Sequence, residues 1–219
     1  MKIATWNLER LEKNKTNQII EILNKLDADI VVLTETSRTI SLENYHVIHT
    51  KELPNSFDGI QYKNGETRVS IFSKYEVLSQ YHTYDEYTAI CVELRTPFGD
   101  LLVYGSIIGV FGNKQPKFNY DLNGQLDDFK QLFPNKLICL AGDFNITLAG
   151  RAWPSKIARQ EILNLQEHYN LISETQKIEN AVDHILLSKA IVEDRTLQLN
   201  TWNIDKILSD HEGYVLRII

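Results

Sequence analysis

The segment Leu137–Asn145, with the sequence LICLAGDFN, is the feature that most constrains how this chain folds. Four of its first five residues are large and apolar and do not alternate with polar ones, a pattern typical of a strand buried on both faces. Gly142 then allows a sharp change of backbone direction, and Asp143 and Asn145 follow two positions apart. In an extended backbone this spacing points both polar heads the same way, beyond the end of the strand. A plain Asx turn is the structural alternative, because Asp and Asn are ordinary loop residues.

Other apolar segments of the chain also carry a polar residue at one end. They are Lys2–Trp6 followed by Asn7, Asp29–Thr34 followed by Glu35, Ala181–Ser188 with Asp183 near its start, and Gly213–Ile219 preceded by Ser209–His211. Carboxylates that a fold brings together raise each other's pKa values and destabilise the protein. A hard divalent metal ion would resolve that conflict, since it prefers oxygen ligands.

Five motifs at these positions resemble, in order and approximate spacing, those of the endonuclease/exonuclease/phosphatase superfamily. They are TWN at Thr5–Asn7, LTE at Leu33–Glu35, GDFN at Gly142–Asn145, VDHILLS at Val182–Ser188 and SDH at Ser209–His211. The superfamily includes exonuclease III, deoxyribonuclease I, inositol polyphosphate 5-phosphatases and neutral sphingomyelinases. The resemblance implies an α/β fold, a four-layer αββα sandwich of two mixed β-sheets flanked by helices. It also implies a hydrolase of phosphoric esters that uses Mg²⁺, with Mn²⁺ as an alternative.

Length and composition are consistent with one domain over residues 1–219. The chain is 43% hydrophobic and has only 5 prolines, so it can bury a large core and shows no linker. Its formal net charge is −6, which counts against a protein that coats nucleic acid non-specifically but not against a nuclease whose site is built of acids. Cys91 and Cys139 lie in apolar patterns and are expected to be buried free thiols.

No signal peptide is recognisable at the start of the chain, and no apolar run approaches the ~18 residues that a membrane span needs. We therefore expect an enzyme without a membrane span, located in the cytoplasm. The sequence leaves the oligomeric state undetermined.

Hydrophobic spacing predicts three helices. The first contains Ile19 and Leu23, with Asn14 or Thr16 as its cap, and it joins two parallel strands in a βαβ unit. The second runs through Leu122, Leu126, Phe129 and Phe133. The third begins at Pro154 or Ser155 and buries a stripe of Ile157, Ala158, Ile162, Leu165 and Tyr169. Between the first two helices the pattern is of short strands, with hairpins at Asn64–Gly65 and Pro97–Asp100.

The resemblance assigns four residues to catalysis. Asp143 would orient and deprotonate the attacking water, and Asn145 would bind the scissile phosphate. His211 would stabilise the charge that develops on the phosphoryl group, and Asp183 would hydrogen-bond the His211 ring, which favours the protonated imidazole. A lone histidine is more often structural, so this assignment depends on Asp183. His184 points to the opposite face of its strand and is expected to pack in the core.

Four residues are expected at the metal. Glu35 is the principal candidate ligand, because Mg²⁺ is usually held by few carboxylates and otherwise by water and substrate. Asn7 would support the metal or a phosphate oxygen, and Asp210 would be a further ligand. Glu9 falls where many relatives carry an Asp and would reach the metal through a water, although it also fits an ordinary solvated face.

Fewer residues point to a nucleic-acid substrate. Relatives often place a Tyr or His near the end of the strand that corresponds to Leu101–Ile108, where this chain has Ser106, which can donate one hydrogen bond. Arg151 and Trp153 are expected to bind substrate, with Trp153 stacking on a base. Further basic and aromatic residues follow the motif strands, namely Arg10, Lys13, Lys15, Arg38, Lys114, Lys117, Lys156, Arg159, Phe111, Phe118 and Tyr120. Exposed loop charges are, however, usually just solvated.

Three hypotheses remain open at this point. The first is a divalent-metal-dependent nuclease that acts on DNA or RNA. The second is a phosphomonoesterase or lipid-head-group phosphodiesterase, of the inositol phosphate or sphingomyelin type, with the same site. The third is a catalytically silent binding module, against which the retention of all five motifs argues, because a buried acid cluster costs stability. A second TWN at Thr201–Asn203 has different flanks, and we interpret it as a chance recurrence.

Overall fold

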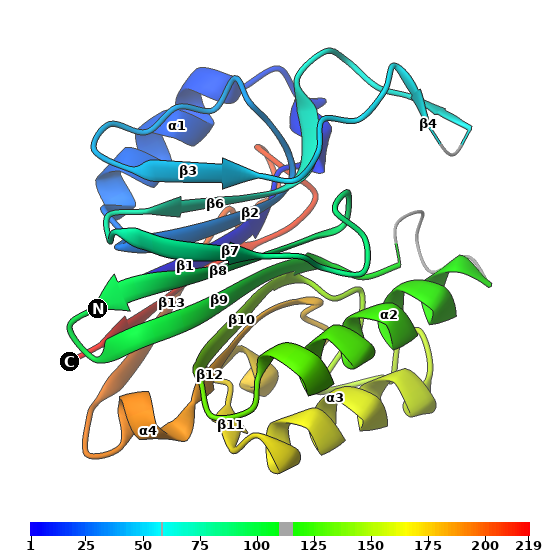
Figure 1. Cartoon of the computed structure of the whole chain (residues 1–219). Helices are drawn as coiled ribbons and strands as arrows, with labels where there is room; N and C mark the ends of the chain where they lie inside the picture. The colour runs from blue at the N-terminus through cyan, green and yellow to red at the C-terminus, as the bar shows by residue number, and fades with distance from the viewer. Residues whose placement is uncertain (58, 110–115) are drawn as a thin grey trace.

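Two six-stranded β-sheets stack face to face, with helices on their outer sides (Figure 1). The computed structural model describes residues 1–57, 59–109 and 116–219. Helix α1 (Thr16–Leu26) covers the first sheet, and α2 (Lys117–Leu132) and α3 (Lys156–His168) cover the second. The αββα arrangement predicted from the resemblance is therefore confirmed.

Both sheets are mixed. In the order of their hydrogen bonding, the strands of the first sheet are β13 (Leu197–Trp202), β14 (Gly213–Ile218), β1 (Lys2–Asn7), β2 (Ile30–Ser37), β6 (Glu66–Ser73) and β3 (His46–His49). Those of the second are β11 (Leu171–Ile172), β12 (Asp183–Ser188), β10 (Leu137–Asp143), β9 (Gly99–Ile107), β8 (Ala89–Thr96) and β7 (Val77–Tyr81). A separate hairpin joins β4 (Ser56–Phe57) and β5 (Ile60–Gln61), and short helical segments are Glu9–Leu11, Thr175–Lys177 and α4 (Lys189–Val192).

The first βαβ unit forms as predicted. Strands β1 and β2 are parallel, and Asn7 pairs with Thr34, the residue before Glu35. This register brings two motif ends to the same edge of the sheet. The predicted cap is wrong: α1 begins at Thr16 after Lys15, and no side chain among the described residues caps it.

The other helices fit their predicted positions. The Ser155 hydroxyl accepts a hydrogen bond from the Ala158 N–H at 3.0 Å and caps α3, as its sequence suggests. Ile157, however, is 75% exposed and lies outside the buried stripe. In α2, a side chain at Gly124 would collide with the ring of Tyr84, so the glycine lets the helix pack closely there. No helix in the described ranges is long and apolar enough to cross a membrane.

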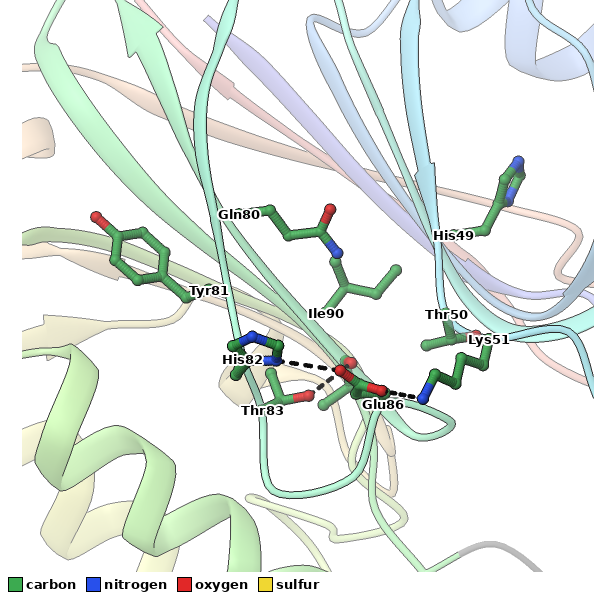
Figure 2. Close-up of a pocket in the computed structure, with 10 residues that line it drawn as sticks. His49, Thr50, Lys51, Gln80, Tyr81, His82, Thr83, Glu86 and Ile90 are labelled. Atoms are coloured by element: carbon green, nitrogen blue, oxygen red, sulfur yellow. Dashed lines mark hydrogen bonds and ion pairs between the residues drawn. The ribbon is translucent and has the colours of Figure 1, made fainter.

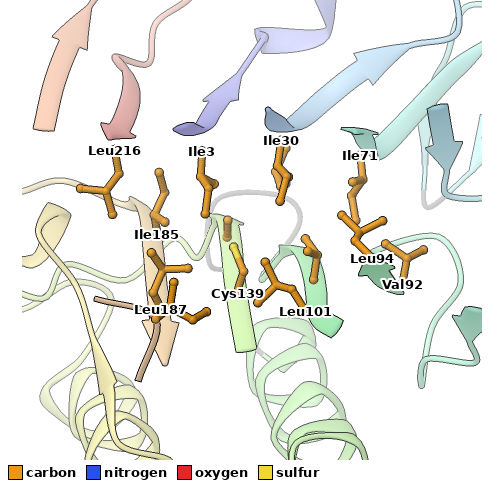
Figure 3. Close-up of a cluster of buried hydrophobic side chains, with 14 of the residues drawn as sticks. Ile3, Ile30, Ile71, Val92, Leu94, Leu101, Cys139, Ile185, Leu187 and Leu216 are labelled. Atoms are coloured by element: carbon orange, nitrogen blue, oxygen red, sulfur yellow. The ribbon is translucent and has the colours of Figure 1, made fainter. Parts of the chain in front are cut away.

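The central core lies between the two sheets. Figure 3 shows Ile3, Ile30 and Ile71 of the first sheet facing side chains of the second sheet, which include Leu101, Cys139 and Leu187. Burying each such side chain contributes roughly 1.5–3 kcal/mol. A second core lies between the first sheet and α1, and a third lies between the second sheet and helices α2 and α3. Cys91 and Cys139 are both free and buried, as predicted.

One predicted hairpin is wrong. The strand before Asn64–Gly65 was expected to pair with the strand after it, but β5 pairs with β4 and β6 pairs with β2 and β3. The turn at Pro97–Asp100 does join paired strands, β8 and β9, with Thr96 opposite Gly99. The short hairpin and the turn after it therefore project from the sheets instead of extending them.

Candidate active site

Two buried carboxylates from neighbouring strands form the centre of the site. Asp143 ends β10 and Asp183 begins β12, and the antiparallel register places the two residues directly opposite each other. Both side chains are almost fully buried. Like charges in this position destabilise a sheet unless other groups compensate them. The surrounding side chains must therefore supply that compensation.

Gly142 allows β10 to lie close to β9 immediately before Asp143. Its φ is +137°, a region that favours glycine, and a Cβ there would lie 1.9 Å from the Ser106 carbonyl oxygen. The glycine of the GDFN motif is therefore required by the backbone. It fixes the position from which the Asp143 carboxylate projects.

Amide groups surround the Asp143 carboxylate. The Asn7 side chain, from the first sheet, donates to Asp143 Oδ2 at 2.9 Å. The Asn145 backbone N–H donates to Oδ1 at 2.9 Å, and the Asn145 side-chain amide lies 3.2 Å from Oδ2. Asn145 has a φ of +51°, and its amide also donates to the Ile108 carbonyl at 3.0 Å. Residues from both sheets therefore orient one carboxylate.

Burial and the adjacent Asp183 raise the pKa of Asp143 to about 7, although His211 and the Asn145 N–H oppose the shift. A change in any of these four influences alters the fraction of Asp143 that is ionised near neutral pH. Such a value suits a general base, which works best when its pKa is near the working pH.

His211 is held against Asp183 as the resemblance implies. Its Nδ1 lies 2.6 Å from Asp183 Oδ2, and its side chain is 19% exposed. Burial lowers the pKa of His211, but the charge and hydrogen bond of Asp183 outweigh burial and raise it to about 10. The imidazolium is therefore the prevailing form at neutral pH, and its Nε2 faces Asp210 Oδ1 at 3.7 Å.

Asp143, Asp183 and His211 together have the character of a cation site. One ligand atom from each lies within 4.8 Å of the others. Asp183 Oδ1 is buried and has no hydrogen-bond partner among the described residues. An unpaired carboxylate oxygen in a buried acid cluster is the kind of group that a divalent cation satisfies. The carboxylates of this site therefore fit a metal, whereas His211 as an imidazolium has no lone pair to offer one.

Glu35 lies next to this cluster, at an irregular position of β2. Its φ is +44°, and the ladder with β6 runs from Thr34 to Thr36 without it. Burial raises the pKa of Glu35, while His211 and a hydrogen bond from Asn7 lower it. Glu35 therefore shares its electrostatic environment with the other predicted site residues.

The two remaining predicted metal ligands are placed differently. Glu9 Oε2 accepts a hydrogen bond from the Asp210 N–H at 2.9 Å and lies 3.2 Å from Lys13 Nζ. The Asp210 side chain is 60% exposed beside His211. The structure thus brings Glu9 to the backbone of Asp210 and not into the Asp143–Asp183–His211 group.

Ser106 does not join the cluster. Its side chain is fully buried, and its hydroxyl donates to Gln125 Oε1 of α2. Side chains alternate along a strand. Asp143 pairs with Ile107 in the register, and Ile107 belongs to the core between the sheets, so Ser106 faces the helices instead.

The loop that carries Arg151 and Trp153 is fixed by Arg159. The Arg159 guanidinium donates to the carbonyl oxygens of Thr147, Ala149 and Gly150 at 2.6, 3.2 and 3.1 Å, and to the Thr147 hydroxyl at 2.8 Å. Trp153 is 49% exposed on this loop, and Arg151 is exposed. The sequence suggested a basic substrate contact at Arg159, but its donors hold the loop.

Other predicted basic and aromatic contacts have internal partners. Arg10 pairs with Glu66 at 2.9 Å and stacks on Tyr62 at 4.6 Å from the ring centroid. Phe118 is buried in the core. Lys114 and Phe111 lie outside the described residues. His184 is buried, with Nε2 2.9 Å from the Ile146 carbonyl, and burial lowers its pKa to about 4; it is a neutral core residue, as expected.

A hollow of about 330 Å³ opens beside the cluster. It is lined by Asp183, Asp210 and His211, and also by residues 178–182, Lys206, Glu212 and Tyr214. A second hollow of about 330 Å³ lies at the edge strands β3 and β7 (Figure 2). There Glu86 pairs with Lys51, so these two charges neutralise each other, and it also lies 3.1 Å from His82 Nδ1. None of the predicted site residues lines this second hollow.

The chain also resembles known proteins in sequence and in fold. The model of the Endonuclease/Exonuclease/phosphatase family matches residues 4–211. A comparison with curated proteins gave no match. Among solved structures, the chain is similar to the 3′ phosphatase NExo from Neisseria bound to a product DNA hairpin, with 17% identity, a TM-score of 0.72, and coverage of 100% of this chain and 99% of that one.

Two further structures show the same fold. An AP endonuclease from Archaeoglobus fulgidus has 17% identity and a TM-score of 0.66, with 100% of this chain and 99% of that chain covered. A humanized D. rerio TDP2 has 15% identity and a TM-score of 0.68, with 100% and 98% covered.

Proposed function

Because this chain belongs to the endonuclease/exonuclease/phosphatase family, we propose that it is a divalent-metal-dependent phosphodiesterase that hydrolyses DNA or RNA. Hydrolysis of phosphoester bonds follows from the family itself. The metal, the nucleic-acid substrate and the individual residue roles are our proposal. The observation that carries it is the juxtaposition of Asp143, Asp183 and His211, whose ligand atoms lie within 4.8 Å of one another.

In this proposal, Asp143 accepts the proton of the attacking water. Its carboxylate is oriented by Asn7 and Asn145, and its pKa of about 7 allows it to be ionised and still basic near neutral pH. The Asn145 amide is shared with Asp143 and would turn to a phosphate oxygen. His211, held as an imidazolium by Asp183, stabilises the negative charge that develops on the phosphoryl group.

A divalent metal, Mg²⁺ or Mn²⁺, would be held by Glu35 with support from Asn7 and Asp210. When bound, it supplies a Lewis acid that neutralises phosphoryl oxygens and the leaving group. Glu9 would act on this group only through Asp210, whose backbone it holds. Arg151 and the half-exposed Trp153 would contact the substrate beyond the scissile phosphate.

The nucleic-acid substrate is supported by what the similar structures are described as doing. They include a 3′ phosphatase with DNA bound, an AP endonuclease and an exonuclease from Neisseria meningitidis. The half-exposed ring of Trp153 on a fixed loop adds a surface on which a base could stack.

A second candidate is a phosphomonoesterase that uses the same site. The observation in its favour is that Arg10 and Lys13 pair with glutamates and that the Arg159 guanidinium is directed at backbone carbonyl oxygens. Fewer basic side chains then remain to contact the many phosphates of a long polyanion. A substrate with a single terminal phosphate requires fewer such contacts. This candidate keeps the same residues in the same roles.

A substrate panel tests both candidates. The purified protein with Mg²⁺ is given supercoiled plasmid, abasic duplex, single-stranded DNA, RNA, a 3′-phosphorylated oligonucleotide and inositol polyphosphates. We expect cleavage of a nucleic acid that falls by roughly 10²–10⁴-fold in Asp143→Asn. Release of inorganic phosphate alone would move the protein to the second candidate. Equal activity of wild type and a folded Asp143→Asn would refute the mechanism.

A further inference from the structure

Asn203 is the first residue of the loop that joins β13 to β14 and carries His211. Its side chain makes three hydrogen bonds across this loop. Its amide donates to the carbonyl oxygens of Ser209 at 2.9 Å and His211 at 2.7 Å, and its Oδ1 accepts from the Leu208 N–H at 2.9 Å. One side chain therefore ties the beginning of the loop to its end.

The ladder between the two strands gives this loop no such support. The last paired residues are Trp202 and Gly213, so residues 203–212 lie beyond the ladder. A side chain at Gly213 would lie 2.1 Å from the Trp202 ring, and the strands close tightly at that pair. Beyond the Trp202–Gly213 pair, side-chain hydrogen bonds of Asn203 replace the backbone hydrogen bonds of the ladder.

The bonds converge on the backbone of His211. Its carbonyl oxygen also accepts from the Trp6 indole N–H at 3.0 Å. Its N–H donates to the Ser209 hydroxyl at 3.1 Å, and that hydroxyl donates to the Asn7 carbonyl at 2.6 Å. With Nδ1 held by Asp183, the ring Nε2 is left to face the site.

We propose that Asn203 is a positioning residue that sets the orientation of the His211 imidazole toward the reacting phosphate. The inference rests on the proposed function for the role of His211. Two donors on one carbonyl, from Asn203 and Trp6, fix the peptide plane from which the ring projects. A displacement of about 1 Å in a catalytic group can cost on the order of 10²-fold in rate.

Asn203→Asp is the informative substitution, because it keeps the size and the acceptor for the Leu208 N–H. Its second oxygen would face the carbonyls of Ser209 and His211 without a proton to donate. We expect kcat to fall by roughly 10–100-fold with KM within about twofold of wild type. Asn200→Asp on the exposed face of β13 is the matched control and should leave both constants unchanged.

A double-mutant cycle separates positioning from general loop stability. If Asn203 acts through His211, then Asn203→Asp should cost less than about twofold in a His211→Ala background. An equal loss of kcat in both backgrounds would show that Asn203 supports only the structure. Wild-type kcat in a folded Asn203→Asp would overturn the inference, whereas equal activity of wild type and His211→Ala would overturn the proposed function.

A measurement without substrate completes the test. In Asn203→Ala, amide hydrogen exchange at Leu208 should accelerate by on the order of 10-fold or more, while Asn200→Ala should leave it unchanged. Unaltered protection at Leu208 would contradict the clamp. If no Asn203 variant folds, Trp6→Phe removes the other donor to the His211 carbonyl together with part of a fully buried ring. Its loss of kcat should then disappear in a His211→Ala background, and an equal loss in both backgrounds would contradict the inference.

Discussion

Asp143 and Asp183 stand directly opposite each other in the β10–β12 ladder, with both carboxylates buried between the sheets. Their repulsion is offset by donors that come from elsewhere in the fold. Asn7 and Asn145 donate to Asp143, and His211 binds Asp183. The pair is therefore tolerable only because distant segments converge on it.

The rate of hydrolysis should depend on pH in a bell shape. Activity rises as Asp143 loses its proton near its pKa of about 7 and falls as His211 loses its proton near its pKa of about 10. Asp183 raises both pKa values, so Asp183→Asn should move both limbs to lower pH. The measurement is kcat/KM against pH for both proteins, with the distant Glu76→Gln as control. If both limbs of the pH profile stay in place in Asp183→Asn, then Asp143 and His211 are not the groups that titrate in it.

The stability of the fold should change with pH through the same groups. Because the pKa of Asp143 is raised above its ordinary 3.8, its ionisation destabilises the protein as pH rises through about 7. Asp143→Asn should therefore unfold at a higher denaturant concentration than wild type at pH 8, and the difference should vanish near pH 4. Urea titrations at the two pH values check this. A less stable variant at the higher pH would be the opposite result.

The raised pKa of His211 also makes the protein less stable as pH rises, but here the favoured protonated form is the charged one. Its contribution to stability is fully present below 6.5 and is lost as pH rises through about 10. His211→Ala should therefore lose stability relative to wild type most strongly on the acid side of that range. The same titrations, extended to alkaline pH, should show the two proteins converging. A constant difference across the range would mean that packing and not charge accounts for the loss.

A divalent cation should stabilise the protein if Glu35 and the neighbouring acids hold it. At about 100 times its dissociation constant, a ligand adds about 2.7 kcal/mol to the free energy of unfolding. Mg²⁺ should raise the melting temperature of wild type and do so much less in Glu35→Gln. Calorimetric titration gives the affinity directly, and Glu43→Gln, an exposed acid outside the site, is the control. Equal binding by both variants would remove Glu35 from the metal site.

Trp153 should matter for binding and not for chemistry. Loss of one base–aromatic stack costs about 1–3 kcal/mol, so Trp153→Ala should raise KM for a nucleic acid by roughly 5–150-fold with little change in kcat. Trp153→Phe keeps an aromatic face and should restore most of the affinity. A small phosphate ester that cannot stack provides the comparison substrate. An equal loss for both substrates would show that the ring supports the loop instead.

Much of the site could be predicted because the ends of apolar strands can be recognised from the sequence pattern. Asn7, Asp143, Asp183 and His211 each stand at the end of an apolar run or just before one, and parallel or paired strands bring such ends together. Ser106 shows the limit of this approach. A shift of one residue along a strand turns a side chain to the other face, and an apolar run alone does not fix which face is which.

Long side chains were the harder part. Arg159 and Arg10 look like substrate contacts in the sequence, because a sequence does not show which residues a charged loop side chain contacts. Only the folded chain shows that Arg159 binds three carbonyl oxygens and that Arg10 lies against Glu66 and Tyr62. The role of Asn203 is equally invisible in the sequence, where it looks like part of a chance repeat, because its hydrogen bonds reach residues up to eight positions away.

The hydrogen bond from Asn7 to Asp143 joins the first sheet to the second, and the contact between His211 and Asp183 does so again. The reacting groups are thus divided between the two sheets, and the packing and hydrogen bonds between the sheets keep these groups in alignment. A slight sliding of one sheet over the other would separate Asp143 from His211 while leaving every strand intact. Substitutions in the core between the sheets, such as Ile71→Val or Leu101→Ala, should therefore lower the catalytic rate, as changes at the carboxylates do.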